Sequence, residues 1–168
     1  MSDNSQVAPA QASTGEGVRA VIPNATLRSG FMGVKSKSYT LILTDRRVIF
    51  AQITMAMMKQ LVADARDGAK PEGKGFLGQW GAQLSAYSAW AQRYLEMSPD
   101  QALAETAANF AIERSDITKT SMKTRHGYNE DIATSEHVVI KTTGKKYDIA
   151  LNSGASEAKR ALEAEGMI

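Results

Sequence analysis

The hydrophobic pattern is clearest over residues 39–53, which read YTLILTDRRVIFAQI. Apolar or aromatic side chains alternate along both halves of this segment, and the polar residues 44–47 separate the halves. A period of two is the one that a pleated strand imposes, and β-branched and aromatic residues favour strands. The segment therefore predicts two half-buried antiparallel strands joined by a tight turn.

Further strand-like sequence precedes and follows this hairpin. Residues 18–38 are apolar and rich in β-branched side chains, and Pro23 with Asn24 predicts a turn within them. Strand patterns return at residues 110–112, 117–123, 137–141 and 147–151, and Thr143 with Gly144 predicts the turn between the last two. We therefore expect strands over about residues 18–54 and 109–151.

A different period separates the two groups of strands. Met55, Met58, Leu61 and Val62 recur at steps of three and four, which predicts a helix ending near Gly68. After a loop rich in Gly and Lys, a second stripe predicts another helix; it consists of Leu77, Trp80, Leu84, Tyr87, Ala91 and Tyr94. Residues 55–108 therefore read as a helical insertion between strands.

Helix-start signals mark two further helices. Ser98, Pro99 and Gln101 combine an N-cap, a proline at the first helical position and a capping-box partner, which predicts a short helix to about residue 108. Near the end, an alanine- and leucine-containing face and Gly166 predict a C-terminal helix over residues 154–165. Residues 1–17 hold few large aliphatic side chains and predict a disordered tail before a single domain over 18–168.

Composition excludes several classes of protein. The chain has 168 residues, a net charge of +2 and no cysteine, which rules out disulfides, zinc–thiolate sites and a cysteine nucleophile. The nearly balanced charge makes nucleic acid an unexpected partner for the molecule as a whole. We find no secretory signal and no apolar run of membrane-spanning length, so we expect a cytoplasmic protein.

Catalytic signals are weak. The two histidines, His126 and His137, have no acidic residue at a spacing that indicates a general acid–base pair. The glycines of GAKPEGKGFLG fit neither a Walker nor a dinucleotide-binding pattern. We therefore predict a protein that is not an enzyme and has no cofactor, no metal site and no catalytic residue.

Several phrases together resemble a known family. They are YTLILTDRRVIFA (39–51), NFAIERSDITKTSMK (109–123), VVIKTTGKKYDIAL (138–151) and the final helix. The arrangement resembles bacterial and archaeal pleckstrin-homology-like (PH-like) domains related to GRAM domains, over about two thirds of the chain. The resemblance implies an α+β fold in which two antiparallel sheets form a partly open β-barrel with a C-terminal capping helix. It implies binding of lipids, peptides or proteins, often in oligomers, and it transfers no catalytic residue.

The first candidate site is a basic patch around the hairpin. Between residues 19 and 47 the chain has six basic residues and one acid. Lys35, Lys37, Arg46 and Arg47 are its candidate binding residues, because such a patch attracts an anionic lipid surface. The competing interpretation is that the lysines protect an exposed strand edge, while the arginines are solvated or pair with Asp45 within a register-setting turn.

A second basic run is formed by Lys119, Lys123, Arg125 and His126, with Lys141, Lys145 and Lys146 on neighbouring predicted strands. Acids interrupt this run at Glu130, Asp131 and Glu136, so the sequence ranks it below the first patch.

The remaining candidate is Trp90, which falls off the apolar stripe of its predicted helix. Aromatic residues anchor interfaces, but at helical spacing they also form cores. We therefore hold two functional hypotheses. The first is a non-catalytic PH-like binding or scaffold module that engages a protein partner or forms a homo-oligomer. The second is peripheral binding of an anionic membrane surface through the basic patch before and within the hairpin of residues 39–53.

Overall fold

The computed structural model describes residues 15–30, 34–68, 85–127 and 134–168. Its strands are β1 (Val18–Ser29), β2 (Lys35–Thr44), β3 (Arg47–Gln52), β4 (Phe110–Glu113), β5 (Ile117–Arg125), β6 (Ser135–Thr142) and β7 (Lys146–Leu151). Its helices include α1 (Met55–Gly68), α3 (Pro99–Ala104) and α4 (Ala155–Ala164). Residues 85–91 are also helical. The mixed α+β class is confirmed, and the described strands lie within residues 18–54 and 109–151.

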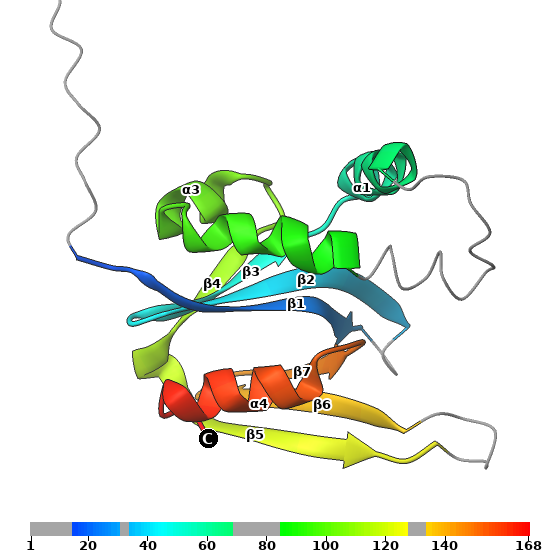
Figure 1. Cartoon of the computed structure of the whole chain (residues 1–168). Helices are drawn as coiled ribbons and strands as arrows, with labels where there is room; N and C mark the ends of the chain where they lie inside the picture. Colours follow the sequence, from blue (N-terminus) through cyan, green and yellow to red (C-terminus); the bar gives the residue numbers. More distant parts are fainter. Residues whose placement is uncertain (1–14, 31–33, 69–84, 128–133) are drawn as a thin grey trace, which may run out of the picture.

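The strands form one antiparallel sheet in the order β4-β3-β2-β1-β7-β6-β5. The sequence predicts two sheets, whereas the ladder is continuous because β1 pairs with β2 on one side and with β7 on the other. The sheet is not closed, since β4 and β5 lie at its two ends. Figure 1 shows β1–β4 above β5–β7, with α4 drawn in front of β6 and β7.

The bend between the two halves lies in β1. Its register against β2 shifts between Ile22 and Ala25, and Asn24 has a φ of 60°. Such a bulge increases the local twist and redirects a strand. The prediction of a turn at Pro23 and Asn24 is therefore wrong, because β1 runs through these residues with a bulge instead of reversing.

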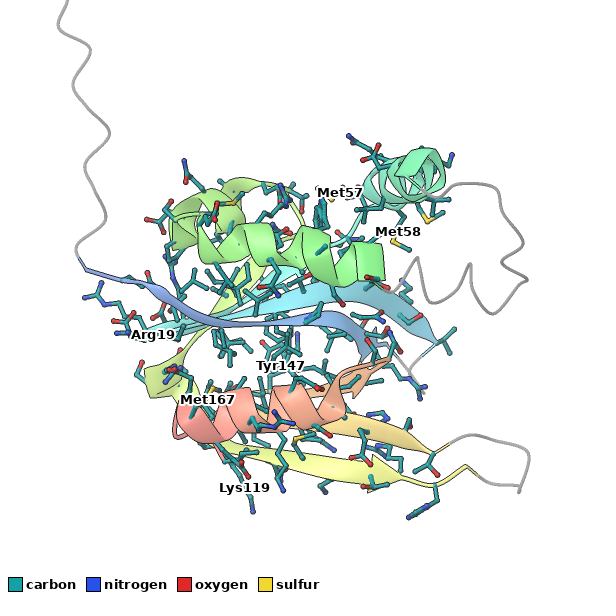
Figure 2. The ribbon with its side chains drawn as sticks, viewed as in Figure 1. Arg19, Met57, Met58, Lys119, Tyr147 and Met167 are labelled. Atoms are coloured by element: carbon teal, nitrogen blue, oxygen red, sulfur yellow. The ribbon has the colours of Figure 1, made fainter. Side chains whose placement is uncertain are left out.

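The main core lies between the two halves of the sheet. Leu41 and Phe50 are both fully buried, as their alternation predicts. The rings of Phe50 and Phe110 stack with their centroids 4.4 Å apart, and Tyr147 reaches both rings from β7. Figure 2 shows Tyr147 pointing into the space between the halves. Side chains on α4, chiefly Ala158 and Leu162, complete this core.

A second, smaller core lies on the other face of β2 and β3. Ile42, Ile49 and Ala51 pack there against Tyr94 and Ala102, which belong to the segment that follows the helix of residues 85–91. This part of the helical insertion therefore covers the sheet. In contrast, α1 exposes Met55 and Met58.

Local signals mark the start of α3 and the end of α4. Ser98 and Gln101 form a complete capping box at the start of α3, with Pro99 at the first position. The predicted end near residue 108 is too late, because α3 ends at Ala104. Gly166, with a φ of 63°, follows α4 as a C-terminal cap. Leu77, Trp80 and Leu84 lie outside the described residues.

The predicted tail overlaps the described structure at its end. Residues 1–14 lie outside the described residues. Glu16 and Gly17 lie against the turn between β2 and β3, where the Gly17 amide donates a hydrogen bond of 3.0 Å to Asp45 Oδ1. The contacts of the domain therefore begin before residue 18.

The aromatic cluster gives a prediction about stability. Phe50→Ala is expected to lower the free energy of unfolding by about 3–5 kcal/mol, because it leaves a cavity beside three other rings. Chemical denaturation followed by tryptophan fluorescence measures this loss. Val34→Ala is the control, since Val34 is 82% exposed and should change stability little. Equal stabilities of the two variants would contradict the core described above.

Candidate functional site

The turn between β2 and β3 holds one candidate arginine in an internal ion pair. The Arg47 guanidinium donates to both carboxylate oxygens of Glu16, each at 2.9 Å, and also contacts Asp100. Its hydrogen bond with Glu16 is the largest cause that raises the pKa of Arg47. Thr44 Oγ1 accepts the Arg46 and Arg47 amides. Arg47 therefore fixes the turn against the start of β1 and α3.

The other residues of the first patch do not converge. Lys35 and Lys37 are exposed at the start of β2, and Arg46 is exposed in the turn that follows its end. Strand residues rise by about 3.3 Å each, so the ten residues of β2 separate these groups by roughly 30 Å. Figure 1 shows the two ends of β2 at opposite sides of the molecule. The patch is thus dense in sequence but divided in space.

Trp90 packs against neighbouring side chains and is not fully exposed to solvent. The Arg93 guanidinium carbon is 4.0 Å from the Trp90 ring centroid, and the Tyr94 ring meets Trp90 edge to face at 5.6 Å. Arg93 and the Tyr94 hydroxyl both bond to Glu105. Half-buried Trp90 thereby joins the second core, where it helps to hold the insertion on the sheet.

Five exposed cations lie together on the outer surface of β5, β6 and β7. Val138, Ile140 and Ile149 point into the core, so residues alternating with them point outward. We call the exposed basic residues of this surface the basic face; they are Lys119, Lys123, Arg125, Lys141 and Lys146. Figure 2 shows Lys119 pointing away from α4 and the core.

Register brings three of these lysines into one row. Lys119 pairs directly with Lys141, and Lys141 pairs directly with Lys146. Directly opposed side chains lie about 4.5–5.5 Å apart at Cβ, and like charges in such pairs are destabilising. None of the three lysines forms a salt bridge with another residue described in the structure. We call them the lysine row.

The acids that interrupt this run in sequence do not interrupt it on the surface. Glu136 alternates with His137, so it lies on the other side of the sheet, where its Oε1 accepts the Thr124 hydroxyl at 2.7 Å. Glu130 and Asp131 lie outside the described residues. The second basic run is therefore more compact than the first patch, in the reverse order to that predicted.

A chain of hydrogen bonds lies among the lysines. His137 is 1% exposed; its Nδ1 is 2.6 Å from Asp148 Oδ1 and its Nε2 is 2.9 Å from Ser135 Oγ. Asp148 Oδ2 accepts a bond from Arg125. No sequence spacing indicates a pair of this kind, so sequence reasoning missed the contact between His137 and Asp148. Because β6 and β7 are adjacent, residues eleven apart in sequence meet across the hairpin.

The charges and hydrogen bonds around Asp148 favour its ionised form. Burial acts to raise the pKa of Asp148, but the hydrogen bond from His137 and the charge of Arg125 outweigh it, so the pKa is lowered. The carboxylate therefore offsets part of the positive charge of the basic face. Ser135 and His137 on β6, Asp148 on β7 and Arg125 on β5 thus form a side-chain network that ties the three strands together.

Hydrogen bonds link Ser135, His137 and Asp148 in the same order as the catalytic triad of a serine hydrolase. A relay becomes an active site only together with donors for an oxyanion and a space for substrate. Here the imidazole is buried, and both of its nitrogens are engaged within the fold. Within residues 15–30, 34–68, 85–127 and 134–168, no group of three or more His, Cys, Asp or Glu side chains is placed to hold a metal ion.

Comparisons with known proteins add little. No family model matches the chain, and no curated protein matches it either. Among solved structures it is similar to the crystal structure of the C-terminal domain of an unknown protein from Leishmania infantum, with 13% sequence identity. That similarity covers 90% of this chain and 84% of the other, with a TM-score of 0.45. In the described part of the chain, no helix combines the length and apolarity needed to cross a membrane.

The lowered pKa of Asp148 predicts an acid-sensitive contribution to stability. A carboxyl whose pKa is lower in the folded state stabilises the fold above its unfolded value, near 3.8, and this contribution is lost as pH falls through the folded pKa. Asp148→Asn should therefore be less stable than the parent protein near neutral pH, and the difference should shrink on acidification. Denaturant titrations across pH measure it; a difference independent of pH would contradict this assignment.

Proposed function

We propose that the chain is a non-catalytic, PH-like binding module in the cytoplasm, and that its basic face engages an acidic protein partner. The PH-like assignment is supported by the strand order 4-3-2-1-7-6-5, by the strongly bent β1 and by a C-terminal helix that packs between the halves of the sheet. It also agrees with the hairpin phrase of β2 and β3, which carries the sequence resemblance.

The observation that carries the proposal is the lysine row. Lysines on an edge strand protect it from aggregation, which accounts for Lys119 on β5. Lys141 and Lys146 lie on inner strands, where this explanation does not apply. Three aligned cations that form no salt bridge in the described structure oppose folding slightly, so we infer that an anionic partner offsets the repulsion.

A second candidate function rests on the hairpin between β1 and β2. Val34 is 82% exposed and is followed by the exposed lysines Lys35 and Lys37. An apolar side chain beside basic ones suits an anionic membrane surface. This alternative uses the opposite end of β2 from Arg46 and shares no residue with the basic face.

Two matched triple variants separate these functions. The row variant carries Lys119→Glu, Lys141→Glu and Lys146→Glu. The control variant carries Lys35→Glu, Lys37→Glu and Lys59→Glu, which reverse three other exposed lysines. Both have the same net charge. Binding is measured by fluorescence anisotropy with labelled poly-L-glutamate and by flotation with phosphatidylserine-containing vesicles, each at low and high salt.

We expect the parent protein to bind poly-L-glutamate at low salt, and the row variant to bind at least about tenfold more weakly, since three exposed ion pairs are replaced by repulsion. The control variant should bind nearly as the parent does. Equal losses in both variants would refute a role for the basic face. Vesicle binding that only the control variant loses would establish the membrane alternative instead. Light scattering of the parent alone tests the homo-oligomer hypothesis.

A further inference from the structure

Strand β5 is a long edge strand. It ends the strand order of the described sheet and has nine residues, whereas β4 at the other end has four. Very short edge strands offer little to a further strand. A long edge strand directs the N–H and C=O groups of alternate residues away from its neighbour, where they are available to an added strand. Of the two edges of the described sheet, only β5 has this length.

The side chains of β5 discriminate between possible occupants. Lys119, Lys123 and Arg125 point outward from the edge strand. Pairing β5 with a second copy of itself in antiparallel register would place basic residues opposite one another, which is destabilising. A strand with acidic residues at alternate positions would instead place each acid beside a base. Charge complementarity thus disfavours another copy of the chain and favours an acidic segment.

The inner side of β5 defines the other positions of such a segment. Ile117 and Met122 are half-buried and pack against the main core. Residues that alternate with the acids would continue this side of the sheet, so threonine or aliphatic side chains suit them. The pattern that fits is therefore acidic and β-forming residues in strict alternation.

We propose that β5 binds an extended acidic segment of the partner protein as an eighth strand of the sheet. This inference rests on the proposed function, because the acids of the segment use Lys119 and Lys123 of the basic face. Main-chain hydrogen bonds to the edge give affinity, and the outward lysines select for acids. Arg125 contributes less, since Asp148 already holds its guanidinium.

Three fluorescein-labelled peptides test the proposal. The first has nine residues, the length of β5, with threonine alternating with glutamate. The second has the same composition, with its glutamates contiguous. The third is the alternating peptide with proline at its central threonine, which removes a main-chain donor. All three are measured by fluorescence anisotropy against the full chain.

We expect the alternating peptide to bind about tenfold more tightly than the contiguous one, because its acids match the outward positions of the edge. The proline peptide should lose a similar factor. Hydrogen exchange followed by NMR should show that amides of β5 gain protection when the alternating peptide is bound, while amides of β4 do not.

Two double variants supply the matched controls. Lys119→Glu with Lys123→Glu should weaken binding of the alternating peptide at least tenfold by replacing attraction with repulsion. Lys35→Glu with Lys37→Glu, which changes the same charge on β2, should leave it nearly unchanged.

The outcomes separate this inference from the proposed function. Equal binding of the three peptides, lost in the β5 variant but without protection of β5 amides, would refute strand addition and leave an acidic partner for the basic face. Failure of the peptides and of poly-L-glutamate to bind at low salt would refute both. Protection of β5 only with the alternating peptide would support both.

Discussion

The arrangement of this protein depends on the bend in β1. One strand pairs with β2 over most of its length and with β7 through Ala25, Thr26 and Leu27. Because the same strand belongs to both halves of the sheet, its bulge determines how they face each other. The Asn24 carbonyl accepts a hydrogen bond from the Asn152 amide at 3.0 Å, and the Asn24 side chain donates one to Ser153 Oγ at 3.1 Å. These two bonds hold the end of β7 at the bend.

This bend gives the two halves different outer surfaces. The outer surface of β2 and β3 is apolar and is covered by the segment that carries Tyr94 and Ala102. The outer surface of β5, β6 and β7 carries lysines, and α4 packs on the inner side of these strands instead. Side chains decide which surface receives a covering layer, because an apolar face must be buried and a charged face need not be. The helical insertion therefore buries the apolar outer surface of one half of the sheet, and the charged outer surface of the other half carries the basic face.

Charges near one another in sequence behave differently from charges near one another in the sheet. Arg46 and Arg47 are adjacent residues, yet Arg46 is solvated while Glu16 and Asp100 hold Arg47. Lys119 and Lys146 are distant in sequence and share a row. In a strand, alternate residues face opposite sides, so an acid such as Glu136 does not neutralise bases that face the other way. A count of charges along the sequence therefore does not show which charges share a surface of the sheet.

Much of the fold follows from local patterns. Alternation over residues 39–53 predicts β2 and β3, and Ser98 with Gln101 predicts the start of α3, because both signals are local in sequence. The turn at Thr143 and Gly144 also fixes the pairing of Lys141 with Lys146 and brings His137 near Asp148. The register of β6 against β7 therefore follows from the position of the turn. The pairing of His137 with Asp148 follows from the same register, but no sequence motif indicates it.

Other features have no local signal. A longer connection separates β5 from β6, so no turn type sets the pairing of Lys119 with Lys141. The Glu16–Arg47 ion pair joins residues 31 apart and lies at the edge of a segment whose composition indicates disorder. Asn24 with a positive φ is equally suited to a turn and to a bulge, and only the pairing partners on both sides of β1 decide between them.

The central claim is that β5, β6 and β7 present aligned lysines on one surface, and the absence of native cysteine allows a direct test. Lys119→Cys with Lys141→Cys replaces a directly opposed pair, at a separation that suits a disulfide. Lys119→Cys with Thr142→Cys places the second thiol on the opposite side of the sheet. Mild oxidation of the folded protein, followed by mass spectrometry, should show an intramolecular disulfide in the first variant and free thiols in the second. Free thiols in the first variant, or a disulfide in both, would contradict the register from which the lysine row is derived.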